Sequence, residues 1–374
     1  MSKFVLLDDS SLKDEFDFVS MKSVARNENC PVFIPVKAED AEKSLFTIQL
    51  IRENIRPQSI TLVTAPSRMG SSHLPKEVQV WNEDGVVEEL SFKAVRKMIC
   101  SLGGDPKTTG WYLQQFLKLG LARSVENDYY ITCDADTLPL RFCNFFDEDG
   151  RPYFTLKREY HARYFKTLYF LLGMKKCIPP SFISEQMVFK TSIVREMLDD
   201  IESLSHIPGD FFWQKILYVS VQVEFTFGSN VFSEFETYGT YVFNKYPLLY
   251  KYRTLNSLRC AALYFGRCMD AKTLEWMSQS INNASFAELE DPRGKYKLIS
   301  KIVHLLRFMP ADRAVLLVRN LFLALGRLPI SKLRQLRRRI EERSEFDYLF
   351  SDKCNYQADS DGLKQKRGIK NDLH

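Results

Sequence analysis

The sequence lacks the segments that direct a protein into or across a membrane. Only four consecutive apolar residues, 4–7, precede the first acidic residue, and this run is too short for the core of a signal peptide. No uncharged apolar stretch approaches the ~20 residues that a membrane-spanning helix needs. The stretch that comes nearest, at 314–325, is interrupted by Arg319. We therefore expect a cytoplasmic protein that does not cross the bilayer.

Paired cysteines and glycine-rich phosphate-binding loops are absent as well. The eight cysteines form no C-x-x-C pair, and several lie within apolar runs, which favours reduced thiols in the cytosol without structural zinc. Neither G-x-G-x-x-G nor G-x-x-x-x-G-K-S/T occurs, which argues against a dinucleotide fingerprint and a P-loop. Any phosphate that the protein binds is therefore expected to be held mainly by a metal ion.

The remaining pattern indicates an α/β fold. A chain of 374 residues with 45% apolar composition is long enough for one large domain and an accessory one. Strand-like runs such as 30–36 and 59–64 alternate with helix-like stretches such as 39–54, which predicts a mostly parallel sheet flanked by helices. The expected parts are an N-terminal extension (1–29), an α/β domain in two halves (30–136 and 137–250), a wholly helical basic region (251–343) and a disordered polar tail (344–374).

Two aspartates at the end of an apolar run are the most informative feature of the chain. The run at 129–133 leads directly into Asp134 and Asp136. Because side chains alternate along a strand, we expect both carboxylates on one face. Their oxygens suit Mg²⁺ or Mn²⁺, which leave their other coordination positions to water and substrate phosphates. The pair predicts a metal ion with a phosphorylated substrate, and the structural alternative is an Asp-rich turn after a strand.

Other polar residues are expected near the same edge of the sheet. Ligands collect outside the carboxyl ends of parallel strands, where the loop after the first strand carries Lys37 and Asp40 and the loop after the second holds 65–67. A helix predicted at 111–122 has one apolar face, so its other face can contact either a ligand or water. That polar stripe consists of Trp111, Gln114, Gln115 and Lys118.

Four segments taken together are distinctive. They are GWYLQQFLK (110–118), YITCDADT (130–137), FISEQM (182–187) and SEFETYG (233–239). In combination they resemble a bacterial family long filed as a domain of unknown function and grouped with the GT-A glycosyltransferases. The likeness covers residues 30–250, and it implies a GT-A-like fold, a nucleotide-diphosphate sugar donor and a surface-glycan acceptor such as lipopolysaccharide or capsule.

The resemblance also implies roles for individual residues. Asp134 and Asp136 would hold Mn²⁺ or Mg²⁺ at the donor diphosphate, where the ion neutralises charge on the leaving group. His161 is expected either in the donor pocket or as an ordinary surface histidine. Three further residues are expected to bind the donor, namely Lys37, Asp40 and Gln114.

Sugar transfer also needs a base for the acceptor hydroxyl, usually a carboxylate. The candidates in the second half of the domain are Glu185, Asp210, Glu234 and Glu236. Ser233 and Glu236 match a capping box and Asp210 is a suitable N-cap, so these two acids have sufficient structural roles. Glu234 and Glu185 remain as the expected catalytic residues.

Two other readings stay open. In a phosphatase of the haloacid-dehalogenase type, Asp134 would attack phosphorus, Asp136 would act as acid and base, and Asp199 with Asp200 could hold the metal. Leu138 stands where that class expects a small hydroxyl residue or valine, and the second aspartate pair falls in a helical pattern. The other reading is a non-catalytic scaffold that binds glycans or membranes.

The basic charge is concentrated near the carboxyl end. Residues 293–343 carry fourteen Lys and Arg against three acids, a net of +11. Basic faces of amphipathic helices bind anionic lipid surfaces, so we expect peripheral binding to the inner face of the cytoplasmic membrane. The alternative is a helical bundle with solvated basic faces. No known nucleic-acid-reading motif accompanies the charge, and we expect no nucleic-acid partner.

Overall fold

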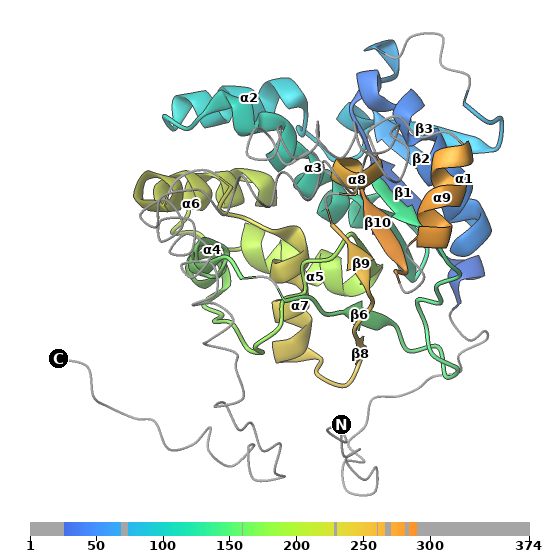
Figure 1. Ribbon diagram of the computed structural model, residues 1–374. Helices are drawn as coiled ribbons and strands as arrows, with labels where there is room; N and C mark the ends of the chain where they lie inside the picture. The colour runs from blue at the N-terminus through green and yellow to red at the C-terminus, as the bar shows by residue number, and fades with distance from the viewer. Residues whose placement is uncertain are drawn as a thin grey trace, which may run out of the picture. The chain divides into compact units, whose positions relative to one another are not determined.

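A five-stranded sheet of order β3-β2-β1-β4-β7 forms the centre of the computed structural model (Figure 1). Strands β1 to β4 pair in parallel, and β7 joins the edge of β4 in the antiparallel direction. The predicted α/β fold with a mostly parallel sheet flanked by helices is thereby confirmed. The strands are β1 Pro31–Pro35, β2 Ser59–Thr64, β3 Val78–Asn82, β4 Tyr129–Cys133 and β7 Gln186–Lys190.

The structure describes residues 26–68, 74–158, 160–227, 230–259, 261–265, 271–280 and 284–289. The basic stretch at 293–343 and the polar tail at 344–374 lie outside these residues, so the expectations for them stay predictions. Across the described ranges, no helix is both long and apolar enough to span a bilayer.

Helices cover both faces of the sheet, so its strands are buried on both sides. In β4, Tyr130 packs with the larger hydrophobic core, whereas Ile131 belongs to a second core that includes Ile48 of α1. Such two-sided burial is typical of parallel strands and explains why these runs are almost continuously apolar. The helices are α1 Leu45–Asn54, α2 Phe92–Ser101, α3 Thr109–Gly120, α4 Ala162–Leu172, α5 Thr191–Glu202, α6 Phe212–Phe227, α7 Glu234–Lys245, α8 Ala262–Phe265 and α9 Ala271–Ser280.

Short strands bring the end of the described chain back to the two aspartates. Strand β5 Thr137–Pro139 starts directly after Asp136 and pairs with β10 Phe286–Glu288, which also pairs with β9 Ser257–Leu258. The N–H of Leu289 donates to the backbone oxygen of Asp136 at 2.9 Å. This return places residues from 257–289 beside the aspartate turn.

The prediction of a wholly helical region from residue 251 is wrong. Besides β9 and β10, residues Lys251–Arg253 form β8, which pairs in parallel with β6 Tyr153–Thr155. Each of these strands has three residues or fewer, which is too short for an alternating pattern to show in the sequence.

Candidate functional site

Asp134 and Asp136 lie in a turn and not on a strand. Strand β4 ends at Cys133, and the N–H of Thr137 donates to the Asp134 oxygen at 3.1 Å, which closes a tight turn. The expectation that strand alternation places both carboxylates on one face is therefore wrong, because the strand stops before the first of them. The Asp134 side chain is 31% exposed, and Asp136 is exposed at the carboxyl edge of the sheet.

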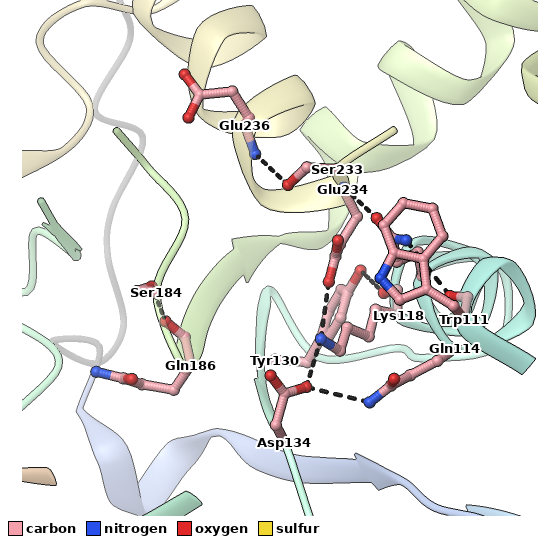
Figure 2. A network of polar contacts seen from close by, with 11 residues as sticks. Trp111, Gln114, Lys118, Tyr130, Asp134, Ser184, Gln186, Ser233, Glu234 and Glu236 are labelled. Atoms are coloured by element: carbon pink, nitrogen blue, oxygen red, sulfur yellow. Dashed lines mark hydrogen bonds and ion pairs between the residues drawn. The ribbon is translucent and has the colours of Figure 1, made fainter. Parts of the chain in front are cut away.

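A buried lysine on α3 connects this turn to α7 (Figure 2). Lys118 Nζ lies 2.6 Å from Asp134 Oδ1 and 2.7 Å from Glu234 Oε1, and its side chain is only 3% exposed. Burial lowers the pKa of Lys118, but the charges of Asp134 and Glu234 outweigh it and raise the pKa above its usual value. The ammonium group is therefore charged and links two carboxylates that are 100 residues apart in the sequence.

Neighbouring side chains fix this lysine and its partners in place. Gln114 Nε2 donates to Asp134 Oδ1 at 3.2 Å, and Gln115 Oε1 accepts from the Glu234 N–H at 3.2 Å. The hydroxyl of Tyr130 donates to the Lys118 backbone oxygen at 2.9 Å. Of the polar stripe predicted on α3, Gln114 and Lys118 therefore face the aspartate turn (Figure 2), whereas Gln115 is buried against the start of α7.

The start of α7 holds two glutamates with different environments. Ser233 caps the helix and accepts from the Glu236 N–H at 3.3 Å, which confirms the Ser233 half of the predicted capping box, but the Glu236 side chain does not complete it because it bonds elsewhere. The Glu236 carboxylate accepts from Ser181 Oγ at 2.7 Å and from the Phe182 N–H at 3.0 Å, and burial raises its pKa despite these bonds. Glu236 thus holds the 181–182 loop. Glu234, 4% exposed, turns toward Lys118.

Asp210 does not have the capping role expected for it. Helix α6 begins at Phe212, whose N–H donates to Glu202 Oε1 at 3.0 Å. The N–H of Asp210 itself donates to Gln214 Oε1 at 2.7 Å. The cap predicted for this helix is therefore wrong, because Glu202 of α5 takes its first N–H group and Gln214 of α6 bonds the two N–H groups that precede it.

A second buried cluster lies beside the aspartate turn. The backbone oxygen of Glu185 accepts from the Asp134 N–H at 3.1 Å, and the Glu185 carboxylate accepts from Lys157 Nζ and from Ser257 Oγ, the latter at 3.0 Å. Glu288 of β10 lies beside the same carboxylate, and each of the two groups shifts the pKa of the other. Sequence reasoning missed Glu288 because the pairing of β10 with β5 was not foreseen, and it missed Lys157 because an isolated bridge to Ser181 leaves no pattern in the sequence.

Glu185 and Glu288 hold one proton between them. Two buried carboxylates side by side repel each other, so one of the pair stays protonated, and Glu185 Oε2 and Glu288 Oε1 have no hydrogen-bond partner among the described residues. Burial and the adjacent Glu185 raise the pKa of Glu288 to about 9, so Glu288 carries the proton at neutral pH. Burial also opposes the charge of Glu185, but Glu288 and Lys157 outweigh it and lower the pKa of Glu185.

The Glu288→Gln variant is expected to differ from the wild type in how stability depends on pH. Between ~4.3, the pKa of an unfolded glutamate, and the folded value of about 9, the folded protein binds more protons. The wild-type free energy of unfolding should therefore fall as the pH rises through this window. Glutamine keeps a donor toward Glu185 but has no proton to lose, so the variant should decline less. Urea unfolding at several pH values checks this, and parallel curves would contradict the shared proton.

The other predicted donor residues lie on two loops, with Lys37 and Asp40 after β1 and His161 before α4. Lys37 is exposed, and its Cε lies near Gly110 at the start of α3, whereas Asp40 pairs with Lys43. His161 directly precedes α4, and its ring lies 4.8 Å from that of Tyr164. The structure therefore joins Gln114, but not Asp40, directly to the aspartate turn through a described contact.

The second aspartate pair is occupied by ion pairs on α5. Asp199 lies 2.6 Å from Arg123, and Asp200 lies 2.6 Å from Lys245 and accepts from Tyr241. Both aspartates lie on a helix and form ion pairs with basic side chains. This arrangement does not fit the metal-binding pair that the phosphatase alternative requires.

The donor set of the turn fits a divalent ion that is shared with a ligand. Within the described ranges, no group of three or more His, Cys, Asp or Glu side chains is arranged to hold a metal. Mg²⁺, however, commonly uses one or two protein carboxylates and takes its other ligands from water and phosphates. Both described side-chain contacts of Asp134 use Oδ1, which leaves Oδ2 for such an ion alongside the exposed Asp136.

Comparisons with known proteins give a family and several distant structures. A model described as a family of unknown function, DUF6492, matches residues 67–286, which confirms the resemblance drawn from the four segments to a family of that kind. A comparison with curated proteins finds no match.

Several solved structures that are similar to this chain are glycosyltransferases. Mouse xyloside xylosyltransferase 1 has 10% sequence identity and a TM-score of 0.34 over 69% of this chain and 97% of that chain. The galactosyltransferase LgtC, in complex with donor and acceptor sugar analogues, has 10% identity and a TM-score of 0.33 over 75% of this chain and 98% of that chain. The bifunctional glycosyltransferase WbbM has 10% identity and a TM-score of 0.26 over 70% of this chain and 46% of that chain.

Proposed function

Because this chain belongs to the DUF6492 family, whose function is unknown, its activity must be inferred from its own site, and we propose that it is a metal-dependent glycosyltransferase. The donor would be a nucleotide-diphosphate sugar. The observation that carries the proposal is the buried Lys118, which fixes a carboxylate of the aspartate turn and a glutamate of α7 at the carboxyl edge of a parallel sheet. Ligands of open α/β sheets collect at this edge.

The aspartate turn supplies the donor end of the proposed site. Asp134 and Asp136 would hold Mg²⁺ or Mn²⁺ at the diphosphate, and the bound ion would neutralise charge on the departing nucleoside diphosphate. Lys118 and Gln114 hold Asp134 through Oδ1 and so orient its other oxygen. Because these contacts are formed within the protein, the carboxylate needs little reorganisation when a ligand binds.

Glu234 and Glu185 are the proposed acceptor-side carboxylates. Glu234 makes its described side-chain contact through Oε1, which leaves Oε2 as the oxygen that could accept a proton from an acceptor hydroxyl. Glu185 is held by Lys157 and Ser257 and lies beside Glu288, so its carboxylate is enclosed by protein groups. This difference favours Glu234 as the base.

The Glu234→Gln variant is expected to reduce turnover by ~10² to 10⁴ while donor affinity stays unchanged. Glutamine can still accept from Lys118, so the site should keep its shape while losing its base. Kinetics with a nucleotide sugar and acceptor measure this as a lower kcat at an unchanged donor KM. A rise in the donor KM together with the lower kcat would instead make Glu234 a positioning residue for Lys118, and normal turnover would transfer the role to Glu185.

We further propose that the acceptor is a bacterial surface glycan, such as lipopolysaccharide or capsule, and that the protein works at the inner face of the cytoplasmic membrane. Support for the membrane comes from the sequence, through the +11 charge of residues 293–343. A direct test of the transferase proposal incubates purified protein with nucleotide sugars and Mn²⁺ and follows the release of nucleoside diphosphate.

A further inference from the structure

Helix α4 exposes two neighbouring aromatic side chains. Its inner face buries Thr167, Leu168 and Leu171, whereas Tyr169 is 49% and Phe170 is 51% exposed. Among the described residues with large exposed apolar side chains, these two are the only ones adjacent in sequence. The inner face of the helix packs on the protein without these two rings. Tyr169 and Phe170 therefore contribute little to the core.

Positive residues predominate in the sequence around these aromatics. Residues 160–180 contain four Lys and Arg and no Asp or Glu. Lys166 and Lys175 are exposed, and Lys175 Nζ lies 5.9 Å from the centre of the Tyr169 ring. The positive charge and the aromatic rings therefore occupy one continuous surface, which we call the α4 surface and define by Lys166, Tyr169, Phe170 and Lys175.

We propose that the α4 surface docks on an anionic lipid bilayer. Aromatic rings favour the headgroup level of a membrane, and flanking lysines are attracted to acidic headgroups. Phe170 and Tyr169 would enter the interface while Lys166 and Lys175 contact lipid phosphates. A protein partner with an acidic surface would match the positive charge of α4. Such a partner, however, does not require two exposed aromatic rings on this helix.

The position of α4 connects this surface to the candidate site. Thr167 Oγ1 donates to the backbone oxygen of Val231 at 2.6 Å, and Val231 lies two residues before Ser233, the cap of α7. Glu234 follows that cap. Docking through α4 would therefore fix the orientation of the segment that carries Glu234 relative to the bilayer, whatever reaction the site performs.

Cosedimentation of the full-length protein with lipid vesicles tests this inference. The wild type is expected to bind vesicles of phosphatidylcholine mixed with phosphatidylglycerol and to ignore vesicles of phosphatidylcholine alone. The pair Tyr169→Ser with Phe170→Ser, and separately the pair Lys166→Gln with Lys175→Gln, should each weaken binding roughly tenfold. Matched controls are Lys93→Gln with Lys97→Gln on α2, where both lysines are also exposed, and Leu248→Ser, which is 68% exposed.

The basic stretch at 293–343 is a separate source of membrane affinity. Each variant pair is therefore also made in a background with Arg337, Arg338 and Arg339 changed to Gln, where the α4 contribution should remain. The inference is overturned if the wild type does not bind anionic vesicles, if the α4 pairs bind as tightly as their controls in both backgrounds, or if they leave vesicle binding unchanged but dissociate an oligomer seen by light scattering. Nucleotide-sugar turnover on a soluble acceptor, measured on the same variants, should stay at the wild-type level and reports on the transferase proposal separately.

Discussion

Replacing Lys118 with Met is expected to lower the free energy of unfolding by about 3–5 kcal/mol. Removing the ammonium leaves Glu234 as a buried charge without its partner and frees Asp134 Oδ1 of its closest cation. A buried carboxylate without a positively charged partner destabilises the folded state. The apolar methionine itself fits beside the Phe235 ring, whose centre now lies 4.3 Å from Lys118 Nζ. Urea-induced unfolding of the two proteins measures the difference.

Lys245 provides a matched control for this prediction. It also joins two carboxylates, those of Glu196 and Asp200, but its side chain is 37% exposed. Lys245→Met should cost no more than about 1 kcal/mol, the usual range for surface ion pairs. In the double variant Lys118→Met, Glu234→Gln, part of the lost stability should return because the unpaired buried charge is gone. Equal effects of the two single lysine variants would show that the Lys118 network is not a buried one in solution.

The Asp136→Ala variant is expected to lose Mn²⁺-dependent donor binding completely while it remains folded. Asp136 is exposed in the turn, so its removal should leave the core intact, but the proposed ion would keep only one protein carboxylate. Titration calorimetry with nucleotide sugar, in the presence and absence of Mn²⁺, measures the change. Unchanged donor affinity and an unchanged metal response would remove the metal role from the aspartate turn.

The Asp134→Asn variant separates the metal role from the structural one. It should lose donor binding as Asp136→Ala does, but it should also lose stability, because Lys118 would then keep only one charged partner. A variant that binds the donor normally while it unfolds more easily would show that Asp134 serves the fold alone.

The central sheet could be predicted because its signal is local. Strand β4 and its neighbours are runs of five or six mostly apolar residues, and burial on both faces makes the apolar runs nearly continuous. The turn at Asp134 was not foreseen in the same way, because the sequence shows where the apolar run stops but not that the backbone turns there. Strands β5, β8, β9 and β10 were missed since two or three residues carry no period.

The candidate site was only half predictable for a different reason. Gln114 and Lys118 stood out as a polar stripe on a helix, and Glu234 stood out as an acid in a first helical turn. The sequence does not show that Lys118 joins Asp134 to Glu234. Lys118 and Glu234 are 116 residues apart, and their contact depends on how α3 and α7 pack. The shared proton of Glu288 depends in the same way on the return of β10 to the aspartate turn.

The release of nucleoside diphosphate from a panel of nucleotide sugars tests the central claim most directly. Purified full-length protein, incubated with each donor and Mn²⁺ or Mg²⁺, is predicted to release nucleoside diphosphate from at least one of them. The release should stop on chelation of the ion and in the Asp136→Ala variant. No release from any donor by a folded wild-type protein, or release that persists both without divalent ions and in that variant, would contradict the assignment of a metal-dependent glycosyltransferase.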